Sequence, residues 1–174
     1  MLQRYERFRW RRGVLMILLW LMAAACQPVL SETIRGQADT AFPPGELHAD
    51  PEKYIGKIIL LGGTVVRVTN ESTRSVLELL ERPLGSRLEP EAGDVTLGRA
   101  LIVFDKTLDD QIFYQGRKVT LAAEIVGRET RPLDETTYTY PLLKVREYHL
   151  WPVAAEGYSS DPQFHIGIGI FHGF

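Results

Sequence analysis

Residues 58–70 read IILLGGTVVRVTN, and this stretch decides the fold. It is rich in β-branched residues, which favour a strand, and its thirteen residues are long for a strand of a small domain. Gly62 and Gly63 interrupt it, and glycines inside a strand usually mark a bulge or a sharp bend. We therefore expect one strand that bends at the glycines and takes part in two sides of a small barrel.

Four further stretches read as strands and complete a set of five. Residues 70–73 (NEST) resemble a turn and would join the first two strands in a hairpin. Residues 83–98 and 128–137 read as loops, and residues 105–116 read as a helical connector. The four additional strands are RSVLELLER (74–82), ALIVF (100–104), RKVTLAAEIVG (117–127) and YTYPLLKVREYHLW (138–151).

A short helical turn is expected directly before the first strand, in HADPEKYIGK (48–57). Asp50 suits the cap, and Pro51 suits the first helical position, where its missing N–H costs nothing. Gly56 suits the end of the turn, because it adopts a positive φ without strain. One or two helical turns are therefore predicted to precede the barrel.

The same pattern recurs 60 residues later in the chain. Gly62 and Gly63 then fall opposite two other small residues, Ala122 and Ala123. Two copies are too few for a solenoid. We therefore interpret the likeness as two strands that each enter a sheet in the same way, directly after a helical turn. The aligned residues are Tyr54, Gly56, Lys57, Ile59, Leu61, Val65 and Val66 with Tyr114, Gly116, Arg117, Val119, Leu121, Ile125 and Val126.

The order of these elements predicts the fold class. A helix between the third and fourth of five strands is the layout of the oligonucleotide/oligosaccharide-binding (OB) barrel. An immunoglobulin-like sandwich needs about seven strands. We therefore predict a mainly β protein: a five-stranded OB-fold-like barrel with a short N-terminal helical turn and a helix between strands 3 and 4.

The N-terminus has the layout of an export signal. Residues 1–12 hold five arginines against one glutamate, and residues 13–25 contain no charge. This apolar run is too short for a membrane-spanning helix, which needs about 20 residues. The pair Arg11–Arg12 leaves the twin-arginine export route open beside the general one.

The stretch LMAAACQ (21–27) contains the only cysteine, Cys26, so no disulfide forms within the chain. Small residues before a cysteine resemble the lipobox of bacterial lipoproteins, although Ala23 stands where leucine is commoner. The resemblance implies cleavage before Cys26 and acyl chains, palmitate among them, on that residue. Gln27 in place of aspartate implies sorting to the periplasmic face of the outer membrane. The alternative is an inert, buried Cys26.

The predicted domains follow from this cleavage. They are a signal peptide (1–25), a tether (26–46), the barrel domain (47–152) and a C-terminal tail (153–174). Removing the leader leaves 15 basic against 21 acidic residues, a net charge of about −6 with neutral histidines. Nucleic-acid binding relies on a basic surface, so no nucleic-acid partner is expected.

Several blocks resemble, in order and spacing, the Slp family of starvation-inducible outer-membrane lipoproteins over residues 47–152. The resemblance implies a lipoprotein linked to stationary phase or stress, without established enzymatic activity, and it supplies no catalytic residues. The blocks are LGGTVVRVTN, VLELLERPL, GRALIVF, LDDQIFYQGRKVTLAAEIVG and YPLLKVREYHLWP.

The chain has no nucleophile elbow, phosphate loop, zinc-protease motif or paired cysteines. We therefore predict a non-enzymatic protein without catalytic residues, metal or cofactor. A carboxylate pair of the glycosidase type has no local signature, so a periplasmic carbohydrate-binding module or hydrolase with a carboxylate-lined groove is the alternative. The residues considered are the carboxylates Glu78, Glu81, Asp105, Asp109, Asp110 and Glu124, the histidines His48, His149, His165 and His172, and the aromatics Tyr148 and Trp151.

The expected partners are the outer membrane, through the lipid anchor, and another envelope protein. The tail FHIGIGIFHGF (164–174) alternates apolar residues with glycines, as a strand does. Three interpretations stay open: an edge strand of the domain, a segment contacting a membrane or partner, or a disordered end.

Overall fold

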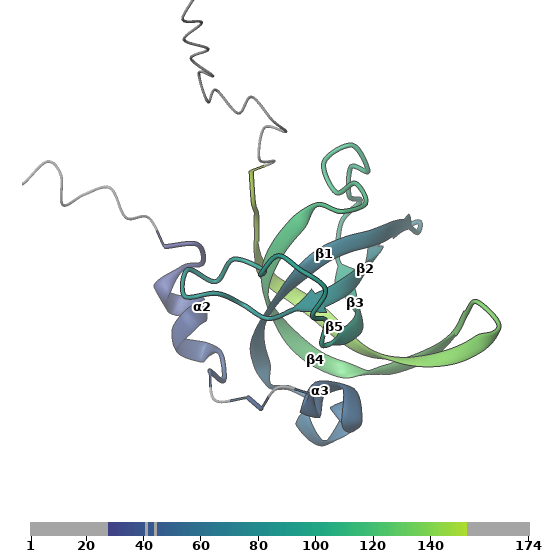
Figure 1. Cartoon of the computed structure of the whole chain (residues 1–174), viewed down its shortest axis with the longest axis horizontal. Coiled ribbons are helices and arrows are strands. Elements are labelled where there is room, and N and C mark those ends of the chain that lie inside the picture. Colours follow the sequence, from purple (N-terminus) through teal and green to yellow (C-terminus); the bar gives the residue numbers. More distant parts are fainter. Residues whose placement is uncertain (1–27, 41, 44, 153–174) are drawn as a thin grey trace, which may run out of the picture.

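Five strands form a closed barrel in the order β1-β2-β3-β5-β4 (Figure 1). The computed structural model describes residues 28–40, 42–43 and 45–152. Strands β3 and β5 pair in parallel, and all other neighbours pair antiparallel. The predicted mainly β, five-stranded barrel is confirmed. The strands are β1 (Ile58–Asn70), β2 (Ser75–Arg82), β3 (Gly98–Phe104), β4 (Lys118–Leu133) and β5 (Thr136–Leu150).

β1 takes part in two sides of the barrel, as the sequence predicts, and it changes neighbours at the glycine pair. The register irregularity of the β1–β2 pairing lies further along the strand, between Val65 and Arg67. Residues 58–64 pair with β4 and residues 62–70 pair with β2, so the strand passes from one neighbour to the other at Gly62 and Gly63. A methyl group on Gly63 would overlap the carbonyl oxygen of Leu80 and lie 2.8 Å from its carbonyl carbon. The close approach of two backbones requires glycine here.

The 60-residue likeness has a structural counterpart. The N–H of Gly56 donates to the carbonyl of Ile125 at 2.8 Å, and the N–H of Gly116 donates to the carbonyl of Val65 at 2.8 Å. A shift of 60 residues maps the first hydrogen bond onto the second. Both glycines have positive φ, +87° and +89°. The two copies are therefore β1 and β4, which pair with each other around a local twofold axis.

Three short helices precede or open the barrel: α2 (Glu32–Gln37), α3 (Glu46–Ala49) and the 3-10 helix η1 (Pro51–Tyr54). The last two occupy the predicted helical turn. Part of the segment expected as a tether lies against β5, because Leu30 is buried and Ser31 donates from its N–H and its hydroxyl to Glu147. No helix of the described ranges is long and apolar enough to cross a membrane.

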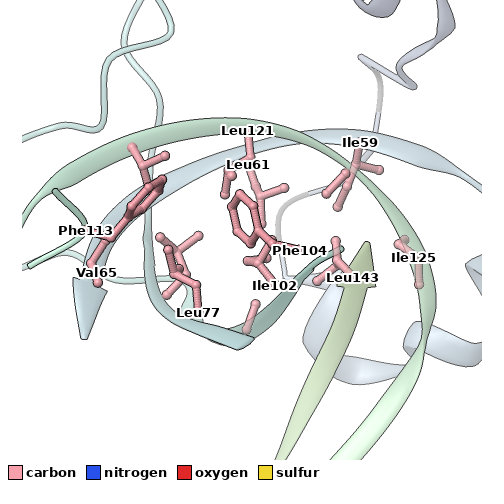
Figure 2. Packing of buried hydrophobic residues seen from close by; sticks show 14 of the residues in the cluster. Ile59, Leu61, Val65, Leu77, Ile102, Phe104, Phe113, Leu121, Ile125 and Leu143 are labelled. Carbon is pink, nitrogen blue, oxygen red and sulfur yellow. The ribbon is translucent and has the colours of Figure 1, made fainter. Parts of the chain in front are cut away.

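The barrel interior is filled by aliphatic side chains of all five strands and by Phe104 (Figure 2). Leu47 of α3 joins this core from the N-terminal side, and Leu108 and Phe113 join it from the connector between β3 and β4. Each of these three side chains is almost completely buried. The core therefore depends on segments outside the strands.

The connector at residues 105–117 corrects one prediction: it forms turns and bends, not a helix. Side chains bind two of its backbone N–H groups. The N–H of Leu108 donates to the side chains of Asn70 and Ser75, and the N–H of Gln111 donates to the carboxylate of Asp109. The bond between Asp109 and Gln111 is local, and local bonds of this kind compete with helix formation.

Residues 128–137, predicted as a loop, continue both neighbouring strands. Beyond Leu142 of β5, the β4–β5 hairpin pairs only with itself and projects from the barrel (Figure 1). We call residues 127–141 the arm. The chain reverses at Asp134, whose φ is +52°, a conformation that aspartate tolerates. The polar composition and Pro132 reflect an exposed two-stranded ribbon, not a loop.

Candidate functional site

An apolar pocket of about 520 Å³ lies beside the start of β1. The strap, which is residues 39–40, 42–43 and 45–47, forms one wall, and the flap, which is residues 83–97, forms another. Small-molecule pockets usually measure about 300–1,000 Å³ and are mostly apolar. The side chains that enclose it include Phe42, Leu47, Leu60, Leu84, Leu88 and Leu97.

The charged side chains of the pocket wall have partners. His48 Nε2 and Glu81 Oε2 lie 2.8 Å apart, and Lys57 Nζ donates to Asp39 Oδ2 at 2.8 Å. Arg82 donates to two backbone carbonyl groups of the flap. The pocket therefore offers a ligand mainly hydrocarbon contacts.

His48 lies beside this pocket, because it binds Glu81 of the pocket wall. Its ring lies against the backbone of Gly98, where an added methyl group would stand 2.7 Å from Cε1. Gly98 also has a φ of +131°. The Nδ1 atom of His48 is buried without a hydrogen-bond partner in the part of the chain that the structure describes. His48, which the sequence left ambiguous, is thus a packing residue that holds α3 to the start of β3.

A second candidate surface lies on the outer face of β1, β2 and β3 and is centred on Glu78. Its side chain is 4% exposed. Arg67 Nε lies 2.9 Å from Oε2, Arg99 Nη1 donates to Oε1 at 2.7 Å, and the Tyr140 hydroxyl donates to Oε1 at 3.4 Å. Burying a carboxylate is costly unless it is paired. Two arginines and one tyrosine fulfil that condition here.

Tyr140 comes from the base of the arm and packs outside the barrel with Val76 and Leu101. The Tyr138 ring meets it edge to face at 4.7 Å. Burial raises the pKa of Tyr140, and the negative charge of Glu78 raises it further. The hydrogen bond to Glu78 raises the pKa of Arg99. The outer face therefore combines a small apolar cluster with a buried ion network.

The raised pKa of Tyr140 predicts a loss of stability in alkali. In the unfolded chain tyrosine loses its proton near pH 10, whereas folded Tyr140 keeps it to a higher pH. The stabilisation is complete below about pH 10 and disappears as the pH rises through the folded pKa. We expect the free energy of unfolding to fall more steeply above about pH 10 in the wild type than in Tyr140→Phe. Urea unfolding over this pH range measures the difference, and parallel curves would contradict the assignment.

The other carboxylates considered from the sequence are exposed or have partners of their own. Asp109 accepts a backbone hydrogen bond within its own turn, and Asp110 is exposed. Glu78 and Glu81 stand three positions apart on β2, so they point to opposite faces. Among the described residues, each remaining carboxylate of the set forms an ion pair: Asp105 with Lys144 and Glu124 with Arg146.

Tyr148 and Trp151 do not form an open aromatic platform. The Tyr148 ring packs on Phe104 and Phe113 at 5.5 and 5.6 Å, and its hydroxyl accepts from Lys106 at 3.0 Å. The indole N–H of Trp151 donates to Thr120 Oγ1 at 2.9 Å. These contacts favour the structural interpretation, a core residue and an aromatic rim.

The remaining sequence-derived sites lie outside the described residues. These are Cys26, Gln27, His165 and His172, together with the C-terminal tail. Within the described ranges no three His, Cys, Asp or Glu side chains are placed to hold a metal ion. The absence of a metal and the lipidation of Cys26 therefore stay predictions.

The fold and its surfaces define a single small β-barrel with an apolar pocket and an ion network on its outer face. The chain belongs to the Slp family of outer membrane lipoproteins, whose family model matches residues 23–168. This confirms the resemblance drawn from the sequence blocks. It places the protein among outer-membrane lipoproteins.

Two relatives are proteins of Escherichia coli strain K12. The uncharacterized lipoprotein YeaY is 28% identical over 170 residues, which cover 94% of this chain and 86% of YeaY. Outer membrane protein Slp is 26% identical over 162 residues, which cover 92% of this chain and 85% of Slp. An uncharacterized protein of Haemophilus influenzae is 24% identical over 99 residues, 56% of this chain and 54% of that protein.

Proposed function

We propose that the protein is a non-enzymatic lipoprotein anchored through acyl chains on Cys26, with its barrel on the periplasmic face of the outer membrane. There it binds another envelope component under stress or in stationary phase. The observation that carries this proposal is the extent of the family match, which begins at residue 23 and includes Cys26 together with the barrel. Gln27, where aspartate would favour the inner membrane, supports the outer-membrane address.

The geometry of the carboxylates supports a non-enzymatic role. Glycoside hydrolysis of the common type needs two carboxyl groups about 5–10 Å apart around one bond. Glu78 is neutralised by two arginines, and Glu81 is paired with His48. Neither has a second carboxylate of the considered set beside it on the same face. The partners of Glu78 and Glu81 therefore speak against either one as a working carboxylate of the hydrolase alternative.

The arm and the outer face of β2 and β3 support a protein partner. This surface combines arginines with the tyrosine pair Tyr138 and Tyr140, and Arg and Tyr are enriched where proteins bind each other. Arg74, beside the arm, lowers the pKa of Glu71 through a hydrogen bond, and Arg131 of the arm lowers it further. Charges of both signs thus border the tyrosine pair, as in a polar interface rim.

A photo-crosslinking residue at Thr136 tests this role in cells. Thr136 is exposed on the arm and, because side chains alternate along a strand, shares the face of Tyr138 and Tyr140. Asp110 is exposed on the connector at the opposite end of β4, which makes it the matched control position. We expect irradiation to give one discrete adduct from position 136, identified by mass spectrometry, and none of that mass from position 110. Equal adducts from both positions, or none from either, would contradict a specific partner on this face.

The enzymatic alternative has its own experiment. Purified protein is incubated with envelope glycan, and the released fragments are compared for the wild type and Glu81→Gln. We expect no release above the buffer control from either protein. Fragments that appear with the wild type and vanish with Glu81→Gln would overturn the non-enzymatic proposal.

A further inference from the structure

We infer that the pocket between the strap and the flap binds a fatty acyl chain of a surrounding lipid. Its volume of about 520 Å³ lies in the usual range for a small-molecule site. Leu84 reaches across it so closely that a methyl group added to Gly62 would lie 2.6 Å from Leu84 Cδ2. The flap thus packs directly over Gly62 of β1, a position without a side chain.

The chemistry of the wall selects an apolar ligand. A polar ligand such as a sugar loses hydrogen bonds to water when it enters a site. It gains affinity only where the site supplies hydrogen-bonding groups that are not already paired within the protein. Here Glu81 is bound by His48, Asp39 by Lys57, and the Arg82 guanidinium by flap carbonyls. Hydrocarbon needs no such partners, so an alkyl chain fits the wall as it stands.

Leu88 gives independent evidence that the apolar lining of the pocket has a function. It has a φ of +63°, a left-handed conformation that is uncommon for any residue other than glycine. Its carbonyl accepts a hydrogen bond of 2.6 Å from the buried Thr120 hydroxyl, which fixes the backbone of the flap there. Glycine or asparagine would take this backbone more easily, yet a leucine side chain stands there and lines the pocket. Strained residues of this kind concentrate at functional sites.

The position of the pocket near the membrane indicates which apolar molecule it binds. This step rests on the proposed lipid anchor. Asp39, where the strap begins, lies 13 positions after Cys26 in the sequence. Even fully extended, this stretch spans at most about 45 Å, so the pocket stays close to the membrane surface. Acyl chains are the apolar molecules present at high local concentration there.

The test uses the full-length lipoprotein in lipid nanodiscs and a diazirine-bearing palmitic acid as the probe. After irradiation, labelled peptides are identified by mass spectrometry. We expect labels on the strap, the flap and the start of β1. A second arm supplies the diazirine on the acyl chain of a phospholipid, which distinguishes a free fatty acid from a membrane lipid as the source.

Leu84→Trp fills the pocket, and Val95→Trp is the matched control, because Val95 is an exposed flap residue outside the pocket lining. Excluding two methylene groups from the site should lower labelling roughly tenfold in Leu84→Trp, and Val95→Trp should label like the wild type. Leu97→Trp is the second filling variant should Leu84→Trp fail to fold. Circular dichroism reports folding of each variant.

Two outcomes would overturn the inference: labels spread evenly over the barrel, or equal labelling of the folded filling variants and the wild type. Membrane attachment is measured in the same preparations by flotation of the nanodisc-bound protein. A protein that stays anchored but takes no label refutes the acyl-chain site alone. A protein that never carried a lipid refutes the anchor itself.

Discussion

Gly63→Ala is expected to lower the free energy of unfolding by about 3 kcal/mol or more, the range of severe overpacking. The added methyl group would overlap the Leu80 carbonyl oxygen and lie 3.0 Å from the Glu81 Cα. Both are backbone atoms, so no side chain can turn away. Gly63 pairs with Glu81 on one side and with Val119 on the other, so β1 cannot move from β2 without disturbing β4.

Urea unfolding followed by circular dichroism measures the loss, and Gly36→Ala is the matched control. Gly36 lies in α2, and an added methyl group there meets no atom within 4 Å. Alanine is favoured over glycine in a helix by up to about 1 kcal/mol, so this variant should be as stable as the wild type or slightly more stable. Equal stability of Gly63→Ala and Gly36→Ala would show that the β1–β2 pairing relaxes around the methyl group.

The sequence predicts the barrel well where a local signal has one structural outcome. The glycine pair in a long β-branched stretch predicts a strand shared by two sides of a barrel, and β1 pairs with both β2 and β4 at Gly62 and Gly63. The 60-residue likeness was visible as well, but its cause is a pairing of β1 with β4. Pairing between distant segments leaves no trace in either segment alone.

The two errors of secondary structure share one physical origin. The connector has helical composition, yet Asn70 and Ser75, from outside it, bind the N–H of Leu108. The arm has loop composition, yet pairs such as Thr130 with Thr139 hold it as a ribbon. In both places contacts outside the local window override propensity.

The candidate sites were only partly visible for the same reason. Glu78 was considered, but its partners Arg67 and Arg99 lie 11 and 21 residues away in the sequence. Strand register brings them together: Arg67 stands directly opposite Glu78, and Arg99 stands opposite Leu80 on the next strand. The pocket is similarly composite, since the strap, the flap and β1 each contribute only part of its wall.

Cys26→Ser is expected to remove nearly all of the protein from the membrane fraction or to leave an uncleaved precursor. Lipid attachment requires the sulfur, and in proteins with a lipobox cleavage follows lipidation. Each buried methylene contributes about 0.8 kcal/mol, so several long acyl chains anchor a protein stably, whereas the serine variant has none. Because Cys26 is the only cysteine, the substitution breaks no disulfide.

Fractionation with immunoblotting, together with labelled palmitate, measures the effect, and Gln27→Asp is the companion variant. Gln27→Asp keeps the sulfur and should keep the label, but it should move the protein from outer to inner membranes on a density gradient. The pair of variants separates attachment from address: serine abolishes the label, and aspartate only redirects the labelled protein. A mature, membrane-bound Cys26→Ser protein without label would refute the anchor, because the barrel would then reach the membrane through another segment.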